Sequence, residues 1–233
     1  MLEVEALQSG YGPNPVLFGV DFAIREGEVV TLLGRNGMGK TTSVKTILGL
    51  VAPCAGRVRV RGRDVTGLAP EKIARLGIGL VPEGRQVFPT LTVRENLVAT
   101  AANRLNRANP WTLARIHALF PRLRERENQS AKTLSGGEQQ MLSIGRALMT
   151  NPALLILDEA TEGLAPVIRD EIWSCLRLLK SEGLSILLID KNLSALSRFA
   201  DRHVILEKGR SVWQGDGEAL KREEARVHAL IGL

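Results

Sequence analysis

The segment Gly34-Arg35-Asn36-Gly37-Met38-Gly39-Lys40-Thr41 constrains the fold of this chain more than any other part of the sequence. It follows the apolar run EVVTLL and precedes SVKTILGL, so we expect a strand, a glycine loop and a helix in that order. Glycines at this spacing let backbone N–H groups close around phosphates, with the positive end of the helix behind them. Lys40 is expected to bridge β- and γ-phosphate oxygens, and the Thr41 hydroxyl to ligate Mg²⁺, with Thr42 next along the cradle. The sequence therefore predicts a nucleotide-binding loop.

The rest of the chain alternates apolar runs with helical patterns. Strands are expected at 2–8, 16–25, 77–84, 153–159 and 185–190, a terminal hairpin at 201–216, and helices at 93–106, 112–120 and 166–180. This alternation predicts an α/β fold with a mostly parallel sheet that is covered on both faces. The segment 57–63, RVRVRGR, predicts a strand with one solvated face. We expect one domain over residues 1–233, with its core at 1–84 and 150–233 and an inserted helical subdomain at 85–149.

A second acidic motif completes the predicted nucleotide site. The apolar run LLILDE ends in Asp158 and Glu159. The end of such a strand lies at the sheet edge beside the phosphate loop, where Asp158 can hold Mg²⁺. Glu159 can accept a proton from an attacking water. A solvated acidic pair at a strand end is the alternative interpretation.

Composition adds limits on class and partners. The formal net charge is +6, but the three Trp, one Tyr and five Phe are not interleaved with basic residues as a nucleic-acid stacking surface requires. No nucleic-acid partner is expected. No apolar run approaches the ~18 residues needed to cross a bilayer, and the N-terminal segment has no signal-peptide pattern. The two cysteines lie far apart and outside any metal-ligand spacing, which favours a reducing cytosolic setting.

The segment TLSGGEQQMLSIGRALMT places two glycines where a helix is expected to begin. Ser135 and Glu138 have the spacing of a capping box, whereas Gly136 and Gly137 each cost about 1 kcal/mol in a helix relative to alanine. One interpretation is an ordinary helix start with poor propensity. The other is a helix N-terminus without side chains, which leaves backbone N–H groups open to an anion.

With the loop at 34–42, LSGGEQQ at 134–140 and LLILDE at 154–159, the chain resembles the ATP-binding cassette (ABC) ATPases over its whole length. The resemblance implies a P-loop (RecA-like) core, an antiparallel β subdomain and the inserted helical subdomain. It also implies a head-to-tail dimer with a second ATPase subunit, a copy of this chain or a related one. Each ATP then lies between the phosphate loop of one subunit and the signature helix of the other, so that Ser135, Gly136, Gly137 and Glu138 face the partner's γ-phosphate.

The resemblance assigns further positions by spacing. Residues Arg35, Asn36, Gly37, Met38 and Gly39 form the cradle with Lys40, and Glu159 is the general base. Tyr11, the only tyrosine, corresponds to the aromatic residue that stacks on adenine, although it is also consistent with a turn beside Gly12. Val16 can flank the same ring.

Three departures from the family pattern limit which subgroup of ABC ATPases the chain resembles. Glu83 stands where the family usually has Gln, and is expected to ligate Mg²⁺ as that residue does. Lys191 stands at the usual switch histidine, where its ammonium can donate to a γ-phosphate oxygen. Glu162 and Ala165 replace the usual Ser and Asp, so the cross-dimer contacts of that segment cannot be carried over.

VPEGRQVF, EGLAP and the Asp-Lys-Asn triplet resemble one ATPase subunit of branched-chain amino-acid importers. This subgroup implies two membrane permease subunits, a periplasmic solute-binding protein and a peripheral place on the cytoplasmic side of the inner membrane. It also includes importers of urea, amides or aromatic acids. The loop with Val87 and Phe88 is expected to receive a short permease helix, although Phe88 can instead pack between subdomains. A soluble ABC ATPase acting on DNA or ribosomes and a lipid or polysaccharide exporter ATPase are the remaining alternatives.

Overall fold

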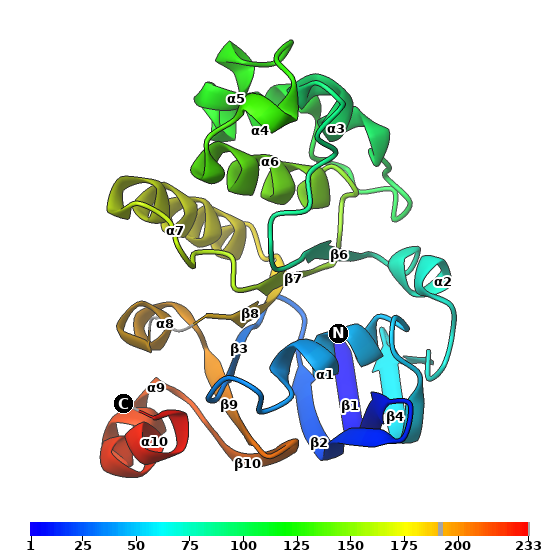
Figure 1. Cartoon of the computed structure of the whole chain (residues 1–233), viewed down its shortest axis with the longest axis vertical. Helices are drawn as coiled ribbons and strands as arrows, with labels where there is room; N and C mark the ends of the chain where they lie inside the picture. The colour runs from blue at the N-terminus through cyan, green and yellow to red at the C-terminus, as the bar shows by residue number, and fades with distance from the viewer. Residues whose placement is uncertain (191–192, 233) are drawn as a thin grey trace.

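The centre of the molecule is a six-stranded sheet with the order β10-β9-β3-β8-β7-β6 (Figure 1). The computed structural model describes residues 1–190 and 193–232. The strands of this sheet are β3 (Val29–Leu33), β6 (Ile78–Val81), β7 (Leu154–Asp158), β8 (Ser185–Ile189), β9 (Arg202–Glu207) and β10 (Arg210–Gly215). All neighbouring strands are parallel except β9 and β10, which form the expected antiparallel hairpin. The predicted mostly parallel sheet is confirmed.

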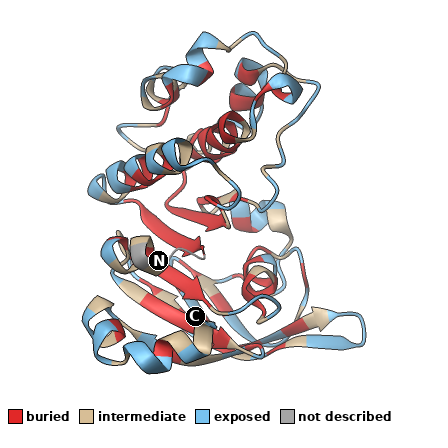
Figure 2. Ribbon diagram, turned by 60° about the vertical axis from the view of Figure 1, so that its left-hand side comes forward, coloured by how far each residue is buried: buried red, intermediate tan, exposed pale blue. Residues whose placement is uncertain are grey.

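Strands β3, β7 and β8 are buried at every residue, because both faces of the sheet are covered. Successive side chains of a strand point to opposite faces, so each strand contributes to two cores. Val29 and Leu33 belong to one apolar cluster, and Val30 and Leu32 belong to the other. Figure 2 shows these buried strands as a red band between the two halves of the molecule. The continuous apolar runs of the sequence are therefore fully buried strands.

A second, antiparallel sheet has the order β2-β1-β4-β5, as the family resemblance implied. Its strands are β1 (Leu2–Tyr11), β2 (Asn14–Ile24), β4 (Pro53–Val60) and β5 (Arg63–Asp64). Helix α1 (Lys40–Ile47) contributes to the apolar cluster that joins this sheet to the central one. The alternating segment behaves as predicted: Val58 and Val60 are buried, whereas Arg59 reaches the carboxylates of two β1 residues.

The helical segments between β6 and β7 gather at one end of the molecule (Figure 1). They are α3 (Val93–Ala99), α4 (Leu113–Leu119), α5 (Pro121–Glu125) and α6 (Gly136–Leu148), with a 3₁₀ turn at Ala131–Thr133. The helix predicted at 93–106 ends early, at Ala99. Asn103 accepts from the Arg107 N–H and donates to its carbonyl, and such local side-chain bonds compete with the helix. The subdomain boundaries at 85 and 149 stay a prediction.

The remaining helices surround the central sheet. They are α2 (Pro70–Ala74), α7 (Pro166–Ser181), α8 (Leu193–Phe199), α9 (Gly217–Arg222) and α10 (Glu224–Ile231). Helix α7 lies between the helical end and the sheet in Figure 1 and buries one face, including Ile172 and Leu176. Among the described residues, no helix has the length and apolarity required to cross a membrane.

Candidate nucleotide-binding site

The loop at residues 34–39 joins β3 to α1, as the motif predicts. Gly34 has a φ of 138°, and a Cβ atom there would lie 2.4 Å from the Leu206 carbonyl oxygen, so no other residue fits without a backbone shift. Gly39, the N-cap of α1, has a φ of 98° and provides no side-chain cap. The first N–H groups of α1 therefore remain open to an anionic ligand.

The Lys40 side chain turns back over this loop. Its Nζ donates to the carbonyl oxygens of Gly34 (2.8 Å) and Arg35 (2.9 Å), and the residue is only 7% exposed. The loop therefore holds the ammonium group in place before any phosphate arrives. Such preorganisation means that little reorganisation is needed when the charge of a phosphate is bound.

A cavity of about 450 Å³ opens at this loop. The loop, Glu83 and Glu159 meet there because they follow β3, β6 and β7, parallel strands whose carboxyl ends lie at one edge of the sheet. Val16 of β2 contributes a fourth segment. The lining residues are Val16, Asn36, Gly37, Gly39, Lys40, Thr41, Thr42, Glu83 and Glu159. The structure thus brings the predicted loop, the predicted base and Glu83 to one site.

Asp158 lies beside this cavity and is almost fully buried, with 3% exposure. The Thr41 hydroxyl donates to its carboxylate at 3.3 Å. Burial raises the pKa of Asp158 above its ordinary value despite this hydrogen bond, and the charge of Glu83 adds to the increase. A hydroxyl and carboxylates are oxygen ligands of the kind Mg²⁺ takes together with substrate phosphates, so the donor set fits this ion. Among the described residues, no cluster of three or more His, Cys, Asp or Glu forms a metal cage.

Glu159 follows β7 with an unusual backbone. Its φ is 53°, in the left-handed region that a residue other than glycine seldom adopts. Its N–H donates to the Ile189 carbonyl at 2.9 Å, which ties this turn to the end of β8. Backbone strain of about 1–3 kcal/mol per residue is characteristic of functional sites, and this strained residue lines the cavity.

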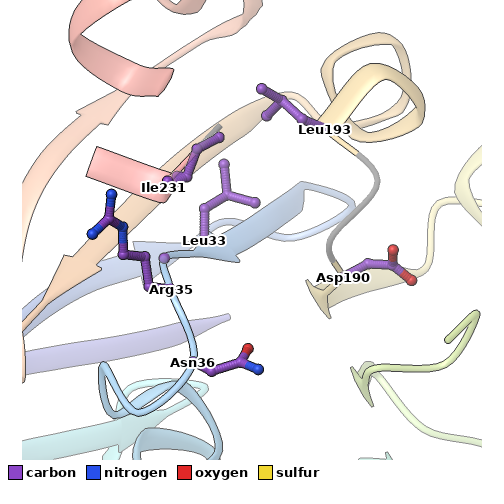
Figure 3. A pocket seen from close by; sticks show the side chains of 8 residues that line it. Leu33, Arg35, Asn36, Asp190, Leu193 and Ile231 are labelled. Carbon is purple, nitrogen blue, oxygen red and sulfur yellow. The ribbon is translucent and has the colours of Figure 1, made fainter. Parts of the chain in front are cut away.

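Two of the predicted cradle residues, Met38 and Arg35, have side chains that contact other parts of the chain. The Met38 sulfur accepts from the Lys208 N–H, and Met38 packs against the apolar cluster below the loop. Arg35 lies against Gly232, whose Cβ position would be 2.5 Å from the arginine Nε. Figure 3 shows Arg35 beside Ile231 in a separate pocket that Asp190 and Leu193 also line. The backbone N–H groups of these two residues remain the predicted part of the cradle.

Of the other predicted residues that the structure describes, Tyr11 and the 135–138 segment do not line the cavity. Tyr11, at the end of β1, is 47% exposed. Ser135 and its neighbours lie at the start of α6, within the helical end of the chain. Lys191 lies outside the described residues.

The start of α6 is a complete capping box. The Ser135 N–H donates to the Glu138 carboxylate at 2.8 Å, and the Glu138 N–H donates to the Ser135 Oγ at 3.3 Å. Gly137 packs against Ile168 at the start of α7, and Gly136 lies under the guanidinium of Arg85. Sequence reasoning missed both contacts, since no periodicity links these residues. The only signal was the pair of glycines itself.

These contacts separate the two glycines in a stability experiment. At Gly137 a Cβ would lie 2.6 Å from the Cγ2 methyl of Ile168, so we expect Gly137→Ala to lower the free energy of unfolding by about 1–2 kcal/mol. At Gly136 the added methyl meets only the mobile end of Arg85, and Gly136→Ala is expected to be neutral or to stabilise by up to ~1 kcal/mol. Urea denaturation measures both.

Ile168→Ala removes the side chain that the new methyl would meet. In that background, Gly137→Ala is therefore expected to lower the free energy of unfolding much less than it does in the wild-type chain. Equal stability of the two single glycine variants would contradict the assigned packing.

Comparisons with known proteins agree with this site. Residues 17–162 match the ABC transporter family. The chain is 42% identical over 232 residues to the high-affinity branched-chain amino acid transport ATP-binding protein BraG of Pseudomonas aeruginosa, covering 100% of both chains. A nucleotide-free ATP-binding cassette from an ABC transporter superposes with a TM-score of 0.85 and 26% identity, over 99% of this chain and 97% of that one. A dimeric bacterial ABC transporter cassette gives 0.78 and 25%, over 93% and 98%.

The matched region contains every residue of the 450 Å³ cavity except Val16, together with Asp158 and the α6 capping box. The likeness thus covers the phosphate loop, the acidic pair and the glycine-rich helix start as one unit. The chain belongs to the ABC transporter family, as one of its ATP-hydrolysing cassettes.

Proposed function

We propose that this chain is the ATP-hydrolysing subunit of a branched-chain amino-acid importer and energises a permease formed by other chains. The observation that carries the proposal is the 42% identity to BraG, which extends over the full length of both chains. Glu83 and Lys191, at positions where most cassettes have Gln and His, support the same subgroup by resemblance.

The roles within one subunit follow from the chemistry of the residues. Glu159 accepts the proton of the attacking water, and Lys40 stabilises the charge on the γ-phosphate. Thr41, Asp158 and Glu83 hold Mg²⁺, which when bound offsets the negative charge of the phosphates. Lys191 donates to a γ-phosphate oxygen, and Tyr11 stacks on the adenine. The exposed side chain of Tyr11 supports that last role, because a ring open to solvent is available to a ligand.

A second cassette completes each site in this proposal. Ser135, Gly136, Gly137 and Glu138 face the γ-phosphate held by the partner subunit, in a head-to-tail pair. The dimeric relative supports pairing, and the 13-residue helix α6 supplies a positive end for a phosphate. ATP favours the closed pair because its γ-phosphate contacts both subunits, and hydrolysis removes that bridge.

The permease docks beside the Glu83 loop. An apolar groove of about 340 Å³ lies there, lined by Leu48, Leu50 and Leu80 among others. Phe88 is 41% exposed at this loop, with the Arg146 guanidinium 4.1 Å above its ring. Asn96 holds the Phe88 backbone through both its N–H and its carbonyl. Two permease subunits and a periplasmic solute-binding protein complete the importer, with this chain peripheral on the cytoplasmic face of the membrane.

The proposal is tested in proteoliposomes that hold this chain, its cassette partner and the permease, with the binding protein inside or outside as orientation requires. We expect leucine, isoleucine or valine to raise ATP hydrolysis several-fold when the binding protein is present. Urea, amides and aromatic acids serve as matched solutes. Stimulation by one of these instead would assign a different solute, and stimulation by nucleic acid without any membrane partner would replace the importer by a soluble ABC ATPase.

A further inference from the structure

A second concave site lies between α7 and α8, outside the nucleotide cavity. It encloses about 360 Å³, which is within the range of small-ligand pockets. Positions 169, 173, 177 and 180 fall on one face of α7 because they are three or four residues apart. Helix α8 closes the other side. The residues that matter are Arg169, Trp173, Arg177 and Lys180 of α7 with Arg198 and Phe199 of α8.

The floor of this pocket is rigid and apolar. The rings of Trp173 and Phe199 meet edge to face, with centroids 5.5 Å apart and planes at 73°. Both residues are nearly buried, at 5% and 6% exposure. The Lys180 Nζ lies 5.7 Å from the centre of the Phe199 ring, at the edge of this floor.

The rim carries four cations and one lining carboxylate, that of Asp170. Lys180 is already paired, since its Nζ lies 2.6 Å from the Asp201 carboxylate and also donates to the Phe199 carbonyl. Within the described part of the chain, the group to which Arg177 donates is neutral, the Ser174 hydroxyl. Among the described residues, no carboxylate lies within ion-pair distance of Arg169, Arg177 or Arg198.

Three guanidinium groups that line one pocket with a single carboxylate repel one another, and a multiply charged anion relieves that repulsion. Guanidinium forks match phosphate oxygens in pairs, with charge-assisted hydrogen bonds. We propose that this pocket binds a small soluble phosphate-bearing anion. A solvated helix face would show the same charges, but it would not require them to surround a concave aromatic floor drawn from two helices.

Hydrogen bonds also link the pocket to β3, the strand that precedes the phosphate loop. The carboxylate of Asp201, the partner of Lys180, accepts from the Val29 N–H at 2.8 Å. The backbone N–H of Asp201 donates to the Val29 carbonyl at 2.9 Å. Val29 begins β3, the strand that ends at Leu33, directly before Gly34 of the phosphate loop. A ligand that binds Lys180 therefore competes with Asp201, a residue that is hydrogen-bonded to β3.

The test uses the full-length chain with its nucleotide site saturated with ADP, and inorganic pyrophosphate as the probe in isothermal titration calorimetry. We expect saturable 1:1 binding, weakened about 10–100-fold in Arg169→Ala/Arg198→Ala because two charge-assisted contacts are removed. The control Arg63→Ala/Lys221→Ala removes the same charge at exposed positions away from the pocket and should keep the wild-type affinity. Unchanged thermal unfolding shows that the variants remain folded.

The outcomes divide cleanly. Absence of saturable binding, or equal weakening in both double variants, overturns the proposal. Sedimentation with phosphatidylglycerol vesicles separates the sources of phosphate: vesicle binding lost in Arg169→Ala/Arg198→Ala, without pyrophosphate binding, would assign the pocket to a membrane headgroup and overturn a soluble ligand.

Discussion

Replacing Glu159 by Gln is expected to lower kcat for ATP hydrolysis by about 10²–10⁴-fold, the range that general acid–base catalysis contributes. Glutamine keeps the size of the side chain and can hold the same left-handed backbone, but it cannot accept the proton of an attacking water. ATP affinity should stay near wild type, because Lys40 and the loop N–H groups are untouched. Phosphate release and calorimetric ATP titration measure the two quantities separately.

The same variant should accumulate an ATP-bound dimer, which light scattering detects. Glu125→Gln is a matched control: it removes one exposed carboxylate outside the cavity and should leave turnover unchanged. Wild-type turnover in Glu159→Gln would remove Glu159 as the base. A slow but strictly monomeric variant with ATP would keep the base and contradict the paired arrangement.

Replacing Lys40 by Ala is expected to reduce both ATP affinity and hydrolysis, each by about 10²-fold or more, because the cation that binds phosphate oxygens is lost. The two carbonyls that accept from Nζ belong to Gly34 and Arg35, at the partly exposed loop, and water can replace the lost donor. The free energy of unfolding should therefore stay near the wild-type value while ATP binding and hydrolysis are lost. Calorimetry with ATP and thermal unfolding together distinguish these effects.

Lys45 provides the control, since it lies on the same helix and is exposed. Lys45→Ala removes an equal charge and should change ATP affinity less than about threefold, the weak effect expected of a screened surface charge. Similar losses in both variants would show that helix charge in general, rather than the ammonium held over the loop, governs binding.

Much of the fold could be predicted because its strongest signals are local. Strands β3, β7 and β8 are buried on both faces and appear in the sequence as unbroken apolar runs. Helix ends were less predictable. The segment after Ala99 continues a helical pattern in sequence, but Asn103 forms its own turn and the chain leaves the helix.

The candidate site likewise has features that sequence order predicts and features that depend on tertiary packing. Thr41, Glu83 and Glu159 meet in one cavity because parallel strands deliver their carboxyl ends to one edge, a rule that sequence order alone supports. The direction of the Arg35 side chain toward Gly232 could not be predicted, because it depends on where the last helix packs. For the same reason the glycines of α6 raised a question that sequence could not answer fully. A larger residue at position 137 would collide with Ile168, which occupies the adjacent space.

That contact has a mechanical consequence. No side chain separates the backbone at the tip of α6 from the branched carbon of Ile168, which lies in the first turn of α7. Densely packed atoms have low compressibility, so a displacement of one group is transmitted to its neighbour. In the proposed head-to-tail pair, a displacement of the α6 tip by the nucleotide on the partner subunit would therefore reach α7 and the segment that joins α7 to Glu159. This contact would couple the two proposed ATP sites mechanically.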